Sequence, residues 1–489
     1  MRTFLAVFLL LGICVGRMQG SAGPSPSAFP APLSFYQSQE AALELLSGSP
    51  LTLWQTLVHR AMEQPMNVLV SALFLGAIVH TFLAPRIGRL ARQLEERGAA
   101  PFPSTLCHYL GEVEAIFGIW VIPVALTMGI RFGWHSFTGY LQKVSYNEPM
   151  FVIVIMAMAA TRPVIACAER LLGFLAGLGR GTPGAWWISI LLIAPLLGSF
   201  ITEPAAITIA ALLLARKFYD HRPSPRLAYA TIGLLFVNVS VGGALSHFAA
   251  PPILMVASLW HWDMAWVFRH FGLPVLAGIT LSTLSYALLF RRELARLATV
   301  PTARPPSHDQ RGAPFWVTAS HLLFIGWTVF NLHTPQVFWF SFLIFLAFMR
   351  ATAPYQSPLR FREPLLVGFF LAGLVTHGGL QEWWIAPLVE DLSARTLFLG
   401  SALLSTFNDN AAVTYLTTLV PKFWDNQALQ YAVVSGALTG GGLTLIANAP
   451  NPAGQSLLQR YFQGGIAPLK LAAAAALPTA IVGCCFLLL

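Results

Sequence analysis

The chain has 489 residues, of which 56% are hydrophobic and only 10% are charged, and its mean hydropathy is +0.65. A soluble protein is usually about a quarter charged, so these values exclude a large soluble domain and indicate a polytopic α-helical membrane protein. The formal net charge of +9 does not indicate nucleic-acid binding, because the basic residues fall in short loops between apolar segments. The five cysteines show no metal-binding spacing and no disulfide framework.

The N-terminus has the pattern of a secretory signal over residues 1–22. Arg2 precedes a short apolar region, and Gly20 and Ala22 offer small residues for cleavage. An uncleaved first helix is the alternative. Residues 23–64 are expected to form an exported tail, mobile in its Ser-, Pro- and Ala-rich part up to Pro50, and residues 65–489 the membrane domain.

Ten apolar segments of this domain are predicted to span the membrane, and two further segments, each with a central acid, are predicted to be re-entrant hairpins. Two of the ten are too long for simple spans, and each contains a glycine-rich break followed by proline. The predicted spans cover residues 65–84, 108–130, 148–165, 226–258, 266–290, 315–332, 335–350, 364–381, 428–459 and 466–489, and the hairpins cover 186–215 and 396–421.

The distribution of Lys and Arg supports this topology. With an exported N-terminus and two hairpins that enter and return on one side, 21 basic residues lie inside and six outside, and the other two belong to the signal. This asymmetry fits the positive-inside rule. If the first hairpin crossed completely, the basic loops at 216–226 and 291–311 would lie outside.

Three sequence pieces recur in the same order and indicate an internal repeat. "EPMFVIVIMAMAAT" from Glu148 matches "EPLLVGFFLAGLVT" from Glu363, and "SFITEPAAIT" matches "STFNDNAAVT", which aligns Glu203 with Asp409. "GGALSHFAAP" from Gly242 matches "GGLTLIANAP" from Gly441. By the charge count the two repeats, about 148–290 and 363–489, have opposite orientations. Inverted repeats with broken helices at the bilayer midplane are typical of secondary transporters.

The second hairpin contains the candidate ion site, Asn408, Asp409 and Asn410. A carboxylate in hydrocarbon is costly unless it has a function. Asp409 can bind a small cation or a proton, and the two amides add neutral oxygens, so sodium is a candidate metal at these three residues. The structural alternative is that Asp409 caps a helix.

The first hairpin contributes Glu203 in "TEPAA", where a helix is expected to begin at Pro204 with Thr202 as its cap. A carboxylate at a helix N-terminus is also stabilised by the dipole, which is the structural alternative for Glu203. The breaks contribute Asn448, with Asn451 as a further oxygen donor, and Ser246 and His247. His247 could relay protons or simply be a packing residue.

The motifs "LGEVEAIFGIW", "SFITEPAAIT", "SHFAAPPILMVA", "FNDNAAVTYL" and "TGGGLTLIANAPNP" resemble those of the bacterial family of sodium/proton antiporters, from about Pro65 onward. More distantly, the pattern is similar to the ion transporter superfamily, which includes arsenite-efflux subunits and sodium/dicarboxylate carriers. The superfamily resemblance implies that the hairpin tips at Thr202, Glu203 and 408–410 face residues 246–249 and 444–448. This implication adds Thr444 to the candidate residues of the ion site. The Ser-Asn-Thr signature of the dicarboxylate carriers is missing, which favours a cation over a dianion.

The expected fold is therefore an all-α polytopic membrane protein with about ten transmembrane helices and two inverted repeats, each with a re-entrant hairpin and a broken helix. The expected function is exchange of a monovalent cation, sodium foremost, for protons across the bacterial inner membrane, with Asp409 as the main exchange site and Glu203 second. The alternative is ion-coupled anion transport of the arsenite or carboxylate type. An intramembrane hydrolase or a non-transporting receptor has little support, because the chain lacks a Gly-x-Gly-Asp or Gly-x-Ser-x-Gly motif and a sizeable soluble part.

We expect no enzyme activity and no organic cofactor. The expected partners are the lipid bilayer, small inorganic ions and, as an open alternative, a second copy of the chain.

Overall fold

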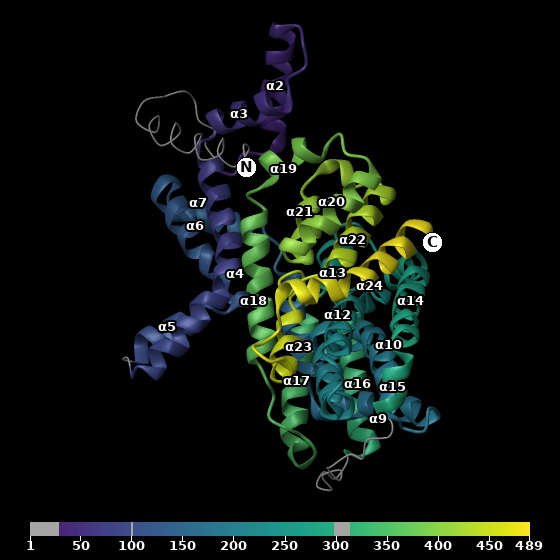
Figure 1. Cartoon of the computed structure of the whole chain (residues 1–489). Coiled ribbons are helices and arrows are strands. Elements are labelled where there is room, and N and C mark those ends of the chain that lie inside the picture. The colour runs from purple at the N-terminus through teal and green to yellow at the C-terminus, as the bar shows by residue number, and fades with distance from the viewer. Residues whose placement is uncertain (1–28, 99–100, 298–312) are drawn as a thin grey trace. The chain divides into compact units, whose positions relative to one another are not determined.

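The computed structural model describes residues 29–98, 101–297 and 313–489 (Figure 1), so the predicted signal at 1–22 lies outside the described residues. The described residues form helices and no strand, which confirms the all-α expectation. They divide into two compact units. Unit 1 comprises Met1–Tyr146, Leu366–Leu392 and Leu416–Phe423, and unit 2 comprises Asn147–Leu365, Ser393–Tyr415 and Trp424–Leu489.

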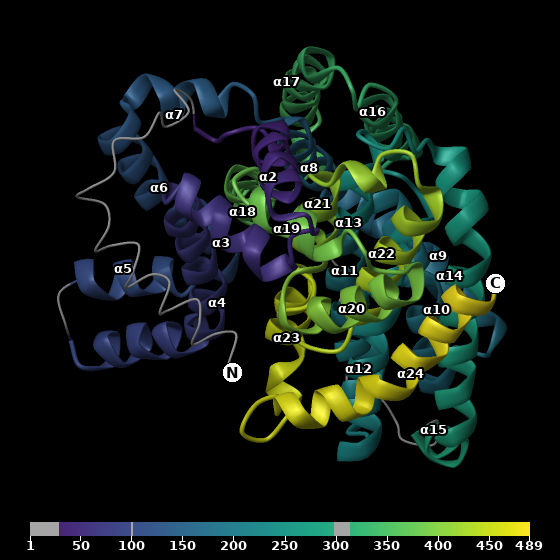
Figure 2. The ribbon, with the colours of Figure 1, turned by 90° about the horizontal axis from the view of Figure 1, so that it is seen from above.

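Unit 1 is built around α4, against which α5 and α6 pack; α6 runs beside α4 in both views (Figures 1 and 2). Its elements are α2 (Leu33–Ser47), α3 (Leu53–Glu63), α4 (Met66–Glu96), α5 (Pro101–Leu110), η1 (Val113–Ala115), α6 (Ile116–Phe132), α7 (Trp134–Leu141), most of α18 (Arg362–Gly378), α19 (Glu382–Val389), the end of α21 (Asn410–Thr418) and η5 (Pro421–Phe423).

The predicted tail contains two helices, α2 over Leu33–Ser47 and α3 over Leu53–Glu63, so the expectation of a mobile stretch is wrong for α2, and export of the tail stays a prediction. Arg60 of α3 is 4% exposed and binds both carboxylate oxygens of Glu40 in α2, at 2.6 and 2.8 Å. It also donates to the carbonyl oxygen of Trp383 in α19 at 2.8 Å. The composition of the tail did not reveal these contacts, because they join residues far apart in the sequence.

Unit 2 contains the remaining elements. They are α8 (Asn147–Ala159), α9 (Arg162–Leu178), α10 (Pro183–Ile201), α11 (Glu203–Lys217), η2 (Tyr219–His221), α12 (Pro225–Gly242), η3 (Gly243–Leu245), α13 (Pro251–Ala257), α14 (Met264–Leu289), α15 (Arg291–Leu297), α16 (Phe315–Phe330), α17 (Pro335–Ala351), η4 (Ala353–Tyr355), α20 (Ala394–Phe407), α22 (Gln427–Gly440), α23 (Asn451–Leu458), η6 (Gln459–Tyr461) and α24 (Pro468–Leu488), with the start of α21 and of α18.

Helix α12 is the centre of unit 2, since 94% of its span is buried. It packs against α10, α14, α22 and α24, and α24 lies across α12 and α14 in both views (Figures 1 and 2). The buried amide of Asn238 donates to the Leu191 carbonyl and the Thr283 hydroxyl, each at 2.9 Å, and its oxygen accepts from Ser282. These satisfied polar contacts join α12 to α10 and α14.

The two predicted repeats have the same order of elements. Each begins with a helix pair bent at a short break, by 67° between α8 and α9 and by 77° between α18 and α19. Each continues with a helical hairpin, α10–α11 or α20–α21, then a helix that ends at a glycine, a break, a short helix that begins beside proline, and a final long helix. The correspondence agrees with the repeat found in the sequence.

Within the described residues, six helical segments are long and apolar enough to cross a membrane, and each of the two bent pairs could make one more span. Helices α16 and α17 are apolar but shorter. The predicted span at 428–459 is interrupted after Gly440, as its glycine-rich break indicated. Helix α10 has 19 residues and could cross by length alone, so the re-entrance of the first hairpin stays a prediction.

Glycines let the two hairpins approach their neighbours closely. A Cβ on Gly242 would lie 2.3 Å from the carbonyl oxygen of Pro195 in α10, and one on Gly440 would lie 2.1 Å from that of Ala402 in α20. Both distances are far below a van der Waals contact. In each repeat the helix after the hairpin therefore touches the backbone of the first hairpin arm.

We predict that Arg60→Met lowers the stability of unit 1 by about 3–5 kcal/mol, because it leaves the Glu40 carboxylate largely buried without its cation. Thermal unfolding of the purified chain in detergent measures the effect. The double variant Arg60→Met with Glu40→Leu should recover part of the loss, and an unchanged midpoint for the single variant would contradict the prediction.

We also predict that Gly440→Ala gives an aggregated or strongly destabilised protein, because backbone cannot easily move away from the new methyl group. Gly400→Ala on α20 is the matched control, since nothing lies within 4 Å of its added Cβ. The control should be neutral or slightly stabilised, as alanine favours helix over glycine by about 1 kcal/mol. Gel filtration and thermal unfolding of both variants decide the matter, and equal behaviour would refute the close-packing argument.

Candidate functional site

The tip of the first hairpin is strained and completely buried. Thr202 joins α10 to α11 with φ +74° and ψ 152°, a conformation that non-glycine residues rarely adopt and that is often found at functional sites. Its hydroxyl makes no capping hydrogen bond, so the predicted cap is wrong. Helix α11 begins at Glu203, whose exposed fraction is 0%.

Glu203 is held by a residue from the other repeat. Its Oε2 accepts a hydrogen bond of 2.8 Å from the Asn448 amide, which lies in the break between α22 and α23. A Cβ on Gly243 would lie 2.7 Å from Oε1, so only glycine leaves room for the carboxylate there. Oε1 has no hydrogen-bond partner among the described residues.

The tip of the second hairpin is capped by its own acid. Oδ1 of Asp409 accepts from the backbone N–H of Ala411 at 2.9 Å, and α21 begins at Asn410. The Asn408 side chain accepts from the backbone N–H of Asp409 at 3.0 Å. The capping alternative for Asp409 thus holds for one of its oxygens. Asp409 is 7% exposed, and its carboxylate interacts electrostatically with that of Glu203.

Asn410 is fully buried between the hairpin tip and the second break. Its backbone N–H donates to the Ala447 carbonyl at 3.0 Å, and its amide nitrogen would lie 2.7 Å from a Cβ on Gly441. Neither side-chain atom of Asn410 has a hydrogen-bond partner in the part of the chain that the structure describes. A buried amide left in this way normally contacts water or a ligand.

The second break is held open by side chains. The Asn451 amide donates to the carbonyls of Gly441 and Thr444 at 3.0 and 2.8 Å. The Thr444 hydroxyl donates to the Thr406 carbonyl of α20 at 2.7 Å. These bonds replace the helical ones that the glycines and prolines remove, so the break is a defined structure.

The first break contains Ser246 and His247, and His247 lines an open pocket. The Ser246 hydroxyl is buried, and neither it nor Nδ1 of the half-buried His247 has a hydrogen-bond partner in the described chain. The pocket measures about 840 Å³, and its other polar lining residues include His261, Asp263 and His333. These residues come from the loop before α14 and the end of α16, both predicted to lie outside.

Buried oxygens without a partner in the described chain are numerous at the first tip, at Asn410 and in the two breaks. Five residues each contribute one oxygen that lacks a partner within the described residues, besides the Glu203 carboxylate. They are Thr202, Ser246, Asn410, Asn448 and Asn451. Carboxylate, amide and hydroxyl oxygens suit small hard cations, and no group of three His, Cys, Asp or Glu in the described chain has the geometry of a transition-metal site.

The structure thus brings Thr202, Glu203, Asp409, Asn410 and Asn448 together. Asn408 and Thr444 hold the hairpin tip and the break in shape, and His247 lines the pocket. The sequence predicted Asn451 as a further oxygen donor, but it did not reveal that Gly243 and Gly441 leave room for Glu203 and Asn410. The paired glycines that align between the repeats were the signal for these two positions.

Three comparisons place the chain among known proteins. A family model described as "Putative Na+/H+ antiporter" matches residues 65–489. The crystal structure of the YdaH transporter from Alcanivorax borkumensis is similar at a TM-score of 0.42 and 13% identity, over 76% of this chain and 96% of that chain. No curated protein matches the chain.

The family match covers all of the described helices from α4 to α24, including both hairpins and both breaks. Together with the apolar helices it identifies a multi-pass membrane protein of a transporter family. The chain belongs to the family of putative Na+/H+ antiporters.

Proposed function

We propose that the chain exchanges a monovalent cation, with sodium the best candidate, for protons, and that the two hairpin tips form the exchange site. The observation that carries the proposal is the oxygen-rich cluster around Glu203, in which one carboxylate oxygen is bonded to Asn448 and the other has no partner among the described residues. Such a carboxylate can bind either a proton or a cation, and binding of the two is then mutually exclusive.

The geometry leads us to place Glu203 first and Asp409 second, the reverse of the order predicted from the sequence. Glu203 is fully buried, whereas one oxygen of Asp409 is already bonded to the N-terminus of α21. A carboxylate bonded to backbone N–H groups is stabilised in its charged form. We therefore assign the exchange to Glu203, whose Oε1 has no partner among the described residues, and a supporting role to Asp409.

The anion-transport alternative is less well supported by these contacts. Helix N-termini attract anions, but the N-terminus of α11 begins with Glu203 and that of α21 is bonded to Asp409. An incoming anion would meet two carboxylates in place of free N–H groups. Uptake or resistance assays with arsenite and carboxylates separate the two functions.

The pocket beside His247 is our candidate for access to the site from outside. The proposal also includes location in the bacterial inner membrane, with the N-terminus exported and the basic loops inside. It requires no organic cofactor.

We predict that Glu203→Gln and Asp409→Asn each abolish cation-dependent proton movement, with at least a tenfold loss of rate, because either change removes a charge from the site. Purified protein in liposomes with an internal pH dye, tested with Li⁺, Na⁺ and K⁺, provides the measurement. Glu112→Gln is a control for a carboxylate outside the cluster. Normal exchange by Glu203→Gln would eliminate the proposed role of that residue.

The pH dependence provides an independent test. Protonation removes the charge that binds the cation, so the Na⁺ concentration for half-maximal exchange should rise as the pH falls, by roughly tenfold per unit where the carboxylate is mostly protonated. At higher pH the dependence should disappear. A half-maximal concentration independent of pH, with only the maximal rate changing, would show that proton and cation do not share a carboxylate.

A further inference from the structure

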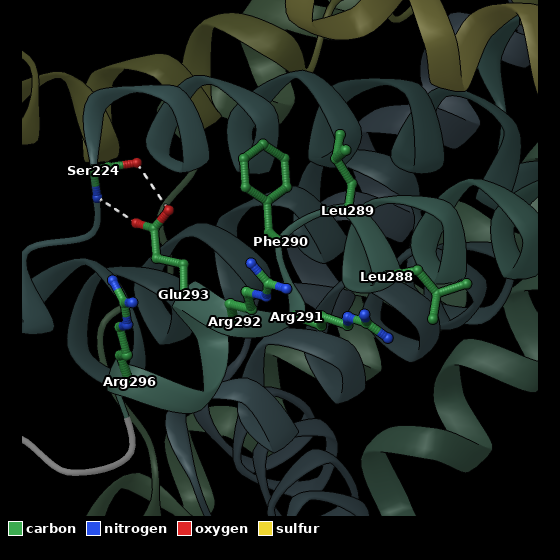
Figure 3. Close-up of a pocket in the computed structure, with 8 residues that line it drawn as sticks. All are labelled: Ser224, Leu288, Leu289, Phe290, Arg291, Arg292, Glu293 and Arg296. Atoms are coloured by element: carbon green, nitrogen blue, oxygen red, sulfur yellow. Dashed lines mark hydrogen bonds between the residues drawn. The ribbon is translucent and has the colours of Figure 1, made fainter.

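A second pocket lies at the end of α14 opposite the His247 pocket, and the exchange site does not use it. It measures about 680 Å³ and is formed where α14 ends and α15 begins, beside the start of α12. Figure 3 shows its lining, in which three arginines, Arg291, Arg292 and Arg296, accompany two leucines. The arginine-rich loops on this side are predicted to face the cytoplasm.

Among the described residues, one acid lines the pocket, and it is bonded to another group. Glu293 accepts hydrogen bonds from the backbone N–H and the hydroxyl of Ser224, at 2.7 and 3.0 Å. Ser224 is the N-cap of α12, so the carboxylate lies at the positive end of that helix. Figure 3 shows Glu293 turned toward Ser224. Within the described residues, neither Arg291 nor Arg292 has an ion pair.

Helix α15 is fixed in place, so the arginines are presented by a defined surface. Leu294 and Leu297 are both 7% exposed, and Leu294 lies next to Gly184 at the start of α10. Arg291 and Arg292, in contrast, are exposed. Helix α15 thus buries its two leucines and presents exposed, positively charged arginines at the pocket.

The rim of the pocket is apolar on the side of the membrane span. Leu288 and Leu289 end α14 and are 67% and 66% exposed. Because α14 is long and apolar enough to cross a membrane, we expect these side chains to lie where acyl chains meet headgroups. A soluble anion would use the arginines and leave the leucines in water, whereas a lipid would contact both.

We propose that this pocket binds the phosphate headgroup of an anionic phospholipid from the cytoplasmic leaflet. Guanidinium groups bind phosphate oxygens through paired hydrogen bonds, and basic pockets at the cytoplasmic ends of transmembrane helices are suited to acidic headgroups. The lipid would join α14, α15 and the start of α12 and so stabilise unit 2. This inference does not depend on the transported ion.

The test uses the full chain purified in neutral detergent, with phosphatidylglycerol or phosphatidylcholine added. Native mass spectrometry counts bound lipids, and thermal unfolding measures stabilisation. We expect phosphatidylglycerol to bind and raise the midpoint by several degrees and phosphatidylcholine to do neither. Arg291→Gln with Arg292→Gln should weaken phosphatidylglycerol binding about thirtyfold, and adding Arg296→Gln should remove it.

A matched control removes three other exposed arginines on the side predicted to be cytoplasmic, Arg86, Arg89 and Arg92 of α4. This triple variant should bind phosphatidylglycerol as the wild type does. Equal losses in both triple variants would overturn the proposal in favour of non-specific charge attraction. Equal stabilisation by soluble glycerol phosphate at the same concentration would overturn it in favour of a soluble anion.

Discussion

The hydrogen bond between Glu203 and Asn448 is the contact on which the architecture of the site depends. It joins the hairpin tip of one repeat to the broken helix of the other, and it buries a carboxyl group where water is scarce. A buried polar group without partners is costly, so the surrounding helices must be positioned to supply them. The second break supplies partners to both tips, since Asn448 donates to Glu203 and the Ala447 carbonyl accepts from the Asn410 N–H.

Close packing at glycines makes this arrangement possible. Gly242 lets α12 touch the first arm of the first hairpin, and Gly440 lets α22 touch the first arm of the second hairpin. Gly243 leaves space for Glu203, and Gly441 leaves space for Asn410. Interfaces between membrane helices rely on such small residues, since lipid provides no hydrophobic force that drives helices together. Neighbouring glycines therefore pack each hairpin against the helix that follows it in its own repeat and leave room for the site side chains.

The sequence predicted the all-helical membrane fold, the repeat and the segments that meet at the site, because length, hydropathy and buried acids are local signals. It did not predict the helices at 33–63, which depend on the Arg60–Glu40 and Arg60–Trp383 contacts. Nor did it show that Thr202 leaves its helix uncapped or that Asp409 caps α21, because short polar residues at a helix start have several possible partners. Only the three-dimensional contacts distinguish a capping carboxylate from one with an oxygen still to be satisfied.

This difference between the two carboxylates bears directly on how the movements of proton and cation would be coupled. Two buried carboxylates that interact electrostatically are costly when both are ionised and the site is empty. A backbone N–H donates to Asp409, whereas within the described residues Glu203 accepts only from the Asn448 amide, so most of the cost falls on Glu203. In the proposed exchange, a proton would neutralise Glu203 directly, and a small cation would do so with the surrounding amide and hydroxyl oxygens as further ligands. If the alternation between inward- and outward-facing states requires a neutralised Glu203, the empty site cannot alternate. Proton and cation must then travel in turn, and exchange without leakage follows from the cost of one uncompensated charge.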